Sequence, residues 1–187
     1  DVIVFQHPYS NKVMIKRLIG LPGDTIQLRS GLIYINGDPI EREPVRSFRY
    51  KQHNQFKTMA KALEYRETLP NGVSYLVHEF PNMTALDDTP VFQIPDGHVF
   101  MMGDNRDNSE DSRAPSGHET LARVNPNGWG VTFDPNTEGF FDAESRAVGF
   151  VPVDHLMGRA ETVLFTIHSC IKAPGAECAK GRVWKGL

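Results

Sequence analysis

Lys16 lies in the largely apolar stretch VMIKRLIG at residues 13–20. Side chains alternate along a strand, so Met14, Lys16 and Leu18 would share one face, with Ile15 on the other. Desolvation disfavours a charged ammonium, and a lysine between apolar neighbours can thereby become a general base near neutral pH. The alternative is a lysine at a sheet edge that points to water and protects that edge.

A polar string, GDNRDNSEDSR at residues 103–113, directly follows the apolar run VFMM at 99–102. Its side chains offer enough donors and acceptors to hold the backbone of a loop in one shape. A loop fixed in this way can support a desolvated amine and keep it correctly aimed.

Two other interpretations of the polar string are open. In a calcium loop, Asp104, Arg106 and Asn108 would be alternating ligands, but Arg106 puts a cation where calcium needs an oxygen. In a purely structural turn, an ion pair between Asp111 and Arg113 would close the loop. The string alone does not separate a structural turn from a functional loop.

The elements that must position these residues are short strand-like runs separated by turn signals, which predict a mainly β fold with antiparallel sheets. Hairpins are expected at Ser30-Gly31 and at Pro70-Asn71-Gly72, with a further turn at Asn36-Gly37. The expected strands are Val2–Phe5, Val13–Ile19, Thr25–Arg29, Leu32–Ile35, Glu67–Leu69 and Val73–Val77.

Two segments depart from this strand pattern. Residues 55–64 carry apolar side chains at i, i+3, i+4 and i+7 from Phe56 onward, the spacing of one helical face. Residues 114–148 place aromatic side chains between prolines and glycines, which predicts a long irregular insertion that folds back onto a surface.

Composition narrows the class of protein. The 187 residues are 40% hydrophobic, enough for a packed core, and carry a net charge of -3 with no long basic block, so no nucleic-acid partner is expected. The seven histidines show no metal-ligand spacing, and we expect no metal and no cofactor. No apolar stretch approaches the roughly 20 residues of a membrane span. The abrupt start at Asp1 suggests a piece of a longer protein.

The C-terminal region holds two further candidates. Cys170 and Cys178 flank the turn signal Pro174-Gly175, which favours a local disulfide and an oxidising compartment over two free buried thiols. Trp184 lies among basic residues, a pattern that suits a membrane interface as well as an exposed tail with one packed tryptophan.

The two chemical segments, taken together and in order, resemble the signature boxes of bacterial type I signal peptidases. These are membrane-anchored serine proteases that use a Ser/Lys dyad to remove signal peptides from exported preproteins. The stretches that carry the resemblance are DVIVF with Pro8, IKRLIGLPGD (15–24), ETLPNGVSY (67–75), VFMMGDNRDNSEDSR (99–113) and GFVPVDHLMGRA (149–160).

The resemblance implies that Lys16 is the general base and that the Ser109 hydroxyl donates a hydrogen bond that orients the lysine amine. It also implies supporting roles, in shaping the loop and holding the boxes together, for Arg17, Gly103, Asp104, Asp111 and Arg113. It further implies a protein of the bacterial inner membrane whose catalytic domain faces the periplasm, and we expect it to be a monomer.

The family's nucleophile lies in a Ser-Met-x-Pro box, and no Ser-Met pair occurs in these residues. We therefore expect the nucleophile, an oxyanion donor and the membrane anchor upstream of Asp1, and no cleavage by this chain alone. Residues 1–40, 93–113 and 149–187 would form the catalytic core and tail, and 41–92 an inserted non-catalytic subdomain. Between Arg113 and Gly149 lie 35 residues where family members often have only a few.

The partners expected are signal peptides and the lipid surface of the membrane. An extended peptide can add to the edge of a sheet and place alternate side chains in shallow pockets. We expect the strand before Lys16 to receive it, with Met14, Ile15 and Val4 forming small pockets; the alternative is that these three are plain core residues.

Two competing functions remain. A Ser/Lys self-cleaving repressor domain would share the catalytic logic, but the polar string and the insertions argue against it. A binding module that keeps the boxes only to hold its fold would lack the upstream Ser-Met-x-Pro segment.

Overall fold

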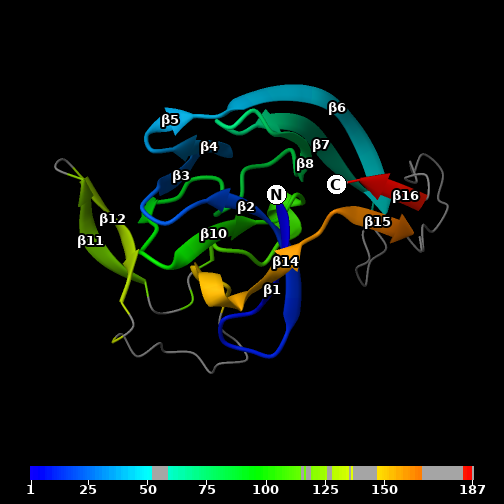
Figure 1. The fold of residues 1–187 in the computed structure, drawn as a ribbon. Coiled ribbons are helices and arrows are strands. Elements are labelled where there is room, and N and C mark those ends of the chain that lie inside the picture. Colours follow the sequence, from blue (N-terminus) through cyan, green and yellow to red (C-terminus); the bar gives the residue numbers. More distant parts are fainter. Residues whose placement is uncertain are drawn as a thin grey trace.

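The computed structural model describes residues 1–51, 59–114, 116, 119–125, 128–134, 136, 147–165 and 183–186. Strands make up nearly all of its regular structure, and the predicted mainly β fold is confirmed (Figure 1). The two helical elements in this part of the chain are 3₁₀ turns, η1 (Arg106–Asn108) and η2 (Val153–His155). No helix among the described residues is long and apolar enough to cross a bilayer.

A five-stranded antiparallel sheet carries Lys16 at its centre. Its strands are, in order across the sheet, β13 (Val151–Pro152), β10 (His98–Met102), β2 (Val13–Gly20), β1 (Val2–Gln6) and β14 (Leu156–Arg159). One face is covered by a small buried cluster that includes Phe5, Val99 and Met101. The strands expected at residues 2–5 and 13–19 are therefore present, each extended by one residue.

A second, six-stranded sheet packs its apolar side chains into the main core. Across this sheet the strands are β11 (Glu119–Asn125), β12 (Gly128–Phe133), β9 (Val91–Gln93), β3 (Thr25–Arg29), β4 (Leu32–Ile35) and β5 (Asp38–Pro39). The β3–β4 hairpin has its predicted bounds, and Ser30 (φ 49°) and Gly31 (φ 77°) form its turn with left-handed backbones.

The expectation of an irregular segment at 114–148 is wrong for residues 119–125 and 128–133. These residues form the antiparallel β11–β12 hairpin, and β12 pairs in parallel with β9. Leu121 and Val131 are register partners in this hairpin, which lies between the prolines and glycines that suggest an irregular segment.

A third sheet is made by β6 (Glu41–Lys51), β7 (Met59–Thr68) and β8 (Ser74–Glu79), all antiparallel. The predicted helix at 55–64 is wrong from Met59 onward, while residues 52–58 lie outside the described part. Glu64 and Glu67 are both buried, on opposite faces of β7. Two buried glutamates obscure the alternation of apolar and polar residues that would mark a strand. The β7–β8 hairpin turns at Pro70-Asn71-Gly72 as predicted, but its strands are residues 59–68 and 74–79 instead of 67–69 and 73–77.

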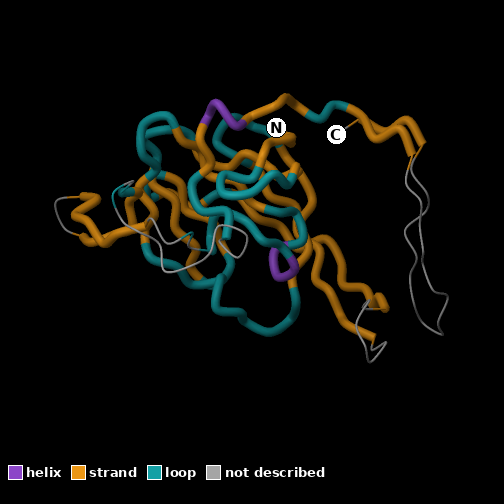
Figure 2. Tube along the Cα trace, turned by 90° about the horizontal axis from the view of Figure 1, so that it is seen from below, coloured by secondary structure: helices purple, strands orange, loops and turns teal. Residues whose placement is uncertain are grey.

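The remaining strands, β15 (Thr162–Phe165) and β16 (Val183–Gly186), pair with each other antiparallel. In both views they project from one side of the molecule, and the β11–β12 hairpin projects from the opposite side (Figure 1, Figure 2). The predicted disulfide between Cys170 and Cys178 lies outside the described residues, as does the side chain of Trp184.

Candidate active site

The Lys16 amine meets the Ser109 hydroxyl although 93 residues separate them in the chain: Lys16 Nζ donates a hydrogen bond to Ser109 Oγ at 3.0 Å. The sheet explains the meeting, because β2 pairs with β10, and the chain leaves β10 directly into the polar string. Both side chains are partly buried. The structure therefore brings together the two residues that the sequence proposes as base and orienting group.

The direction of this hydrogen bond differs from the sequence expectation. A serine hydroxyl has one proton to donate. In the structure Lys16 Nζ is the donor and Ser109 Oγ the acceptor, so the hydroxyl proton is not the one shared between the two side chains.

Gly103 makes room for this arrangement. A Cβ atom at position 103 would lie 2.1 Å from Ser109 Oγ and 2.5 Å from Ser109 Cβ. The backbone of Gly103 does not adopt a positive φ, so the requirement is for space and not for a left-handed conformation. Any side chain at this position would push Ser109 away from where it now lies.

A buried ion pair closes the polar string. Arg113 Nε and Nη2 each lie 2.9 Å from an oxygen of Asp111, and both side chains are fully buried. The Gly103 amide donates to the same carboxylate at 3.0 Å. Burial alone would raise the pKa of Asp111, but the Arg113 guanidinium and these hydrogen bonds hold that pKa below its usual value.

Arg17 ties the lysine strand to the start of the polar string. Its guanidinium donates to both oxygens of Asp104, at 2.8 and 2.9 Å, and lies over the Tyr75 ring with 4.1 Å to the centroid. The backbone of the string is held from the same side, because the His78 amide donates to the Asp104 carbonyl at 2.8 Å.

Sequence reasoning missed two anchors beneath the polar string. The buried Arg106 guanidinium forms a bidentate pair with the buried Glu67 carboxylate, with Nη1 at 2.9 Å from Oε1. Asp107 accepts from the Phe80 amide at 2.5 Å and from the Thr84 hydroxyl at 3.0 Å. Arg106 thus faces a carboxylate and not a cation site, and no local pattern of the sequence links it to Glu67.

The proposed substrate-contact residues divide between two faces. The register pairs Met14 with Phe5 and Ile15 with Val4. Directly paired residues of an antiparallel sheet share a face, so Met14 packs toward the small core cluster while Ile15 and Val4 lie on the opposite face. Ile15 is 54% exposed.

One edge of the lysine strand has no strand partner within the described part of the chain. Residues 13–17 pair with β1 on one side, whereas β10 pairs with β2 only from Arg17 to Gly20 on the other. The second edge of Val13–Lys16 is therefore available for an added strand.

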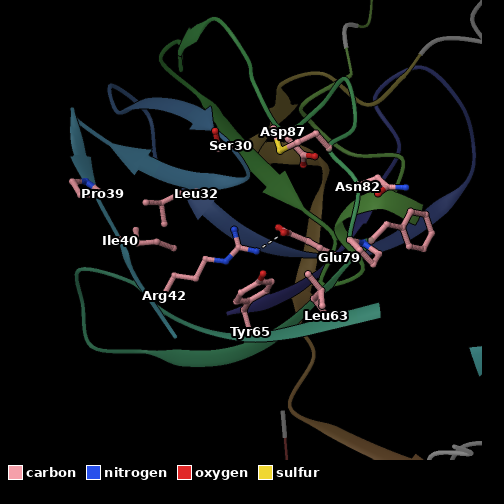
Figure 3. Close-up of a pocket in the computed structure, with 13 residues that line it drawn as sticks. Ser30, Leu32, Pro39, Ile40, Arg42, Leu63, Tyr65, Glu79, Asn82 and Asp87 are labelled. Atoms are coloured by element: carbon pink, nitrogen blue, oxygen red, sulfur yellow. Dashed lines mark ion pairs between the residues drawn. The ribbon is translucent and has the colours of Figure 1, made fainter. Parts of the chain in front are cut away.

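A separate cavity of about 490 Å³ lies between the β3–β4 hairpin and the third sheet (Figure 3). Arg42 forms an ion pair with Glu79 there and stacks on the Tyr65 ring, with 3.9 Å to the centroid. Burial raises the pKa of Glu79 above its usual value. Neither Lys16 nor Ser109 lines this cavity, so it is distinct from the candidate active site.

Comparison with known proteins identifies the family. The sequence model described as "Signal peptidase, peptidase S26" matches residues 1–126. The chain belongs to the S26 signal peptidase family. Signal peptidase I of Rickettsia canadensis (strain McKiel) is 42% identical over 124 residues, which are 63% of this chain and 44% of that protein. Signal peptidase I of Rickettsia typhi (strain ATCC VR-144 / Wilmington) is 34% identical over 173 residues, 89% of this chain and 51% of that protein.

This S26 family chain spans about half the length of the curated relatives that it matches. A crystal structure of a signal peptidase I from Enterococcus faecalis V583 aligns with 84% of this chain and 91% of its own, at 21% identity and a TM-score of 0.39. That score is too low for a geometric comparison. The positions of Lys16 and Ser109 therefore rest on the fold described above.

Proposed function

We propose that this chain is the catalytic part of a serine endopeptidase that removes signal peptides from exported preproteins. The observation that carries the proposal is the hydrogen bond between Lys16 and Ser109, formed between two signature boxes of the S26 family. Lys16 acts as the general base, and Ser109, with Asp111 behind it, orients the amine.

The chemistry of the lysine follows from its hydrogen bond. A neutral amine has two protons and one lone pair. When Lys16 donates one proton to Ser109, the direction of its lone pair is restricted, which is what a general base needs at the moment of proton abstraction. The amine takes the proton of the nucleophilic serine as the serine oxygen attacks the scissile carbonyl, and returns it to the leaving amine.

The nucleophile of this scheme is a serine of a Ser-Met-x-Pro box in the full-length protein, because none of the 187 residues provides that context. Ser109 is not a substitute. It lies in the polar string and not in a Ser-Met-x-Pro context, and its oxygen accepts from Lys16. The full-length protein is proposed to be held at the bacterial inner membrane as a monomer with this chain on the periplasmic side.

The substrate is proposed to bind as an added strand. The unpartnered edge of Val13–Lys16 leads directly to the Lys16 amine, so a signal peptide paired there would bring its scissile bond to the base. Met14 lies on the face of Lys16 and is the better candidate for a pocket next to the scissile bond. Ile15 and Val4 would contact side chains on the other face of the peptide, or the lipid surface.

The proposal is tested in the full-length protein with a preprotein whose signal peptide ends in Ala-x-Ala. Lys16→Ala should lower kcat by roughly 10²–10⁴-fold, the usual range for loss of a general base. Lys12→Ala, a change at an exposed lysine just before the same strand, is the matched control and should leave kcat unchanged. Processing by Lys16→Ala at the wild-type rate would eliminate the mechanism, and binding without cleavage by the wild type would indicate a binding module.

A further inference from the structure

The third sheet, β6–β8, contacts Arg17, which follows Lys16 in β2, and Arg106, which lies three residues before Ser109. Both contacts come from one cross-strand pair of the sheet, called the rung below. Glu67 of β7 and Tyr75 of β8 are register partners, so their side chains lie on one face of the sheet. We propose that Glu67 is a positioning residue for the active site, acting through Arg106, and that Tyr75 does the same through Arg17. This inference rests on the proposed peptidase function and assigns a role to the inserted sheet.

The first arm of the rung is the ion pair between Glu67 and Arg106. Both side chains are almost completely buried, at 0% and 1% exposure, and the guanidinium meets the carboxylate through two nitrogens. Burial disfavours the arginine charge, but the Glu67 carboxylate keeps the pKa of Arg106 above its usual value. A buried pair with this geometry is expensive to separate, so Arg106 has one position.

Arg106 passes this constraint to Ser109. It is the first residue of η1, the short turn that ends immediately before Ser109. Its carbonyl oxygen accepts a hydrogen bond from Arg113, and the same Arg113 guanidinium holds Asp111. Ser109 lies between Arg106 and the Asp111–Arg113 pair in the chain, so displacement of Arg106 would move both ends of the loop that carries Ser109.

The second arm of the rung is the stack of Arg17 on Tyr75. Tyr75 is 7% exposed, and the Arg17 guanidinium lies 4.1 Å from its ring centroid. Arg17 follows Lys16 directly in β2, so the ring limits movement of the strand that carries the base. The distance between base and orienting hydroxyl is therefore set by two neighbouring side chains of one sheet.

The alternative is that Glu67 and Arg106 only attach the third sheet to the rest of the protein. A double substitution separates the two roles. Replacing a buried ion pair by apolar residues of similar size is often neutral or stabilising, whereas removing one partner is not. In the full-length protein, Glu67→Met combined with Arg106→Met should keep the wild-type thermal midpoint within a few degrees.

If Glu67 positions the active site, the double variant should lose roughly 10–100-fold in kcat with KM unchanged, because small displacements of catalytic groups have effects of this size. The single variant Glu67→Asp keeps the negative charge opposite Arg106 and should retain most of the wild-type kcat. A folded double variant with wild-type kcat would overturn the proposal. An inactive wild-type protein would instead refute the peptidase function itself.

A second pair of variants decides the question if the double variant does not fold. Tyr75→Phe keeps the ring under Arg17 and should retain wild-type kcat. Tyr75→Leu removes the ring and should lower kcat by roughly 10-fold with KM unchanged, since the cation–π contact is lost. Equal kcat values for the two variants would overturn the role of the rung.

Discussion

Two carboxylate–guanidinium pairs of this chain, Asp111–Arg113 and Glu79–Arg42, differ in how completely the carboxylate is hydrogen-bonded. Both oxygens of Asp111 accept hydrogen bonds, from Arg113 and from the Gly103 amide. Glu79 pairs with Arg42 on the wall of the cavity in Figure 3, and its Oε1 is buried without a hydrogen-bond partner among the described residues. The pKa of Asp111 is held below its usual value, while burial raises that of Glu79.

The contrast shows that a buried carboxylate stays ionised without a cost in stability only when its surroundings replace the hydrogen bonds that water would make to it. Asp111 has that replacement, from the Arg113 guanidinium and the Gly103 amide. Glu79 lacks part of it, so its ionised form is held at a cost. Three changes would break or sharpen this difference.

The largest effect is expected for Asp111→Asn. The substitution leaves the Arg113 charge buried without its carboxylate, and loss of one partner of a buried pair costs about 3–5 kcal/mol. Because the pKa of Asp111 is lowered in the folded state, its stabilisation is present at neutral pH and is lost as the pH falls through the folded value. Urea unfolding near neutral pH would measure the cost, and a cost below about 1 kcal/mol would contradict the closed pair.

A smaller effect is expected for Gly103→Ala. The added methyl group would overlap Ser109, and such overpacking costs about 1–3 kcal/mol. Displacement of Ser109 should also lower kcat of the full-length protein by roughly 10–100-fold. Gly158→Ala is the matched control, since a Cβ atom there would meet nothing within 4 Å. Equal stability of the two variants would show that the loop accommodates the added methyl group at no cost in stability.

The smallest effect is expected for Glu79→Gln, and it should have the opposite sign. The pKa of Glu79 is raised in the folded state, so ionisation costs stability as the pH rises from the unfolded value of 4.5 through the folded value. The glutamine variant lacks this cost. As the pH is raised from roughly 4 to roughly 8, the free energy of unfolding of the variant should therefore increase relative to that of the wild type by about 1 kcal/mol or less. A decrease relative to the wild type over that interval would mean that the ion pair with Arg42 stabilises the ionised form more than burial destabilises it.

The local parts of the fold were predictable because short-range chemistry determines them. The β3–β4 turn needs left-handed backbones, and Ser30-Gly31 provides them. The meeting of Lys16 and Ser109 was predictable from the order of the family boxes, because β2 and β10 carry these boxes as neighbours in one sheet.

The anchors of the active site were not predictable from local patterns. Glu67 and Arg106 are 39 residues apart, one in a strand and the other in the polar string. Partner choice across such a distance is decided by the packing of whole sheets. For the same reason a helical spacing in β7 gave the wrong element: it counted apolar residues, whereas the strand buries two glutamates.

The parallel pairing of β12 with β9 has a consequence for the behaviour of the molecule in solution. β9 pairs with β3 on its other side, so Gly130 and Val131 of β12 cover an edge of β9 that would otherwise show unpaired amides and carbonyls. Deleting the hairpin would uncover a strand of the central sheet as a template for pairing between molecules. A variant without residues 119–133 should therefore associate more readily than the whole chain, which light scattering would measure.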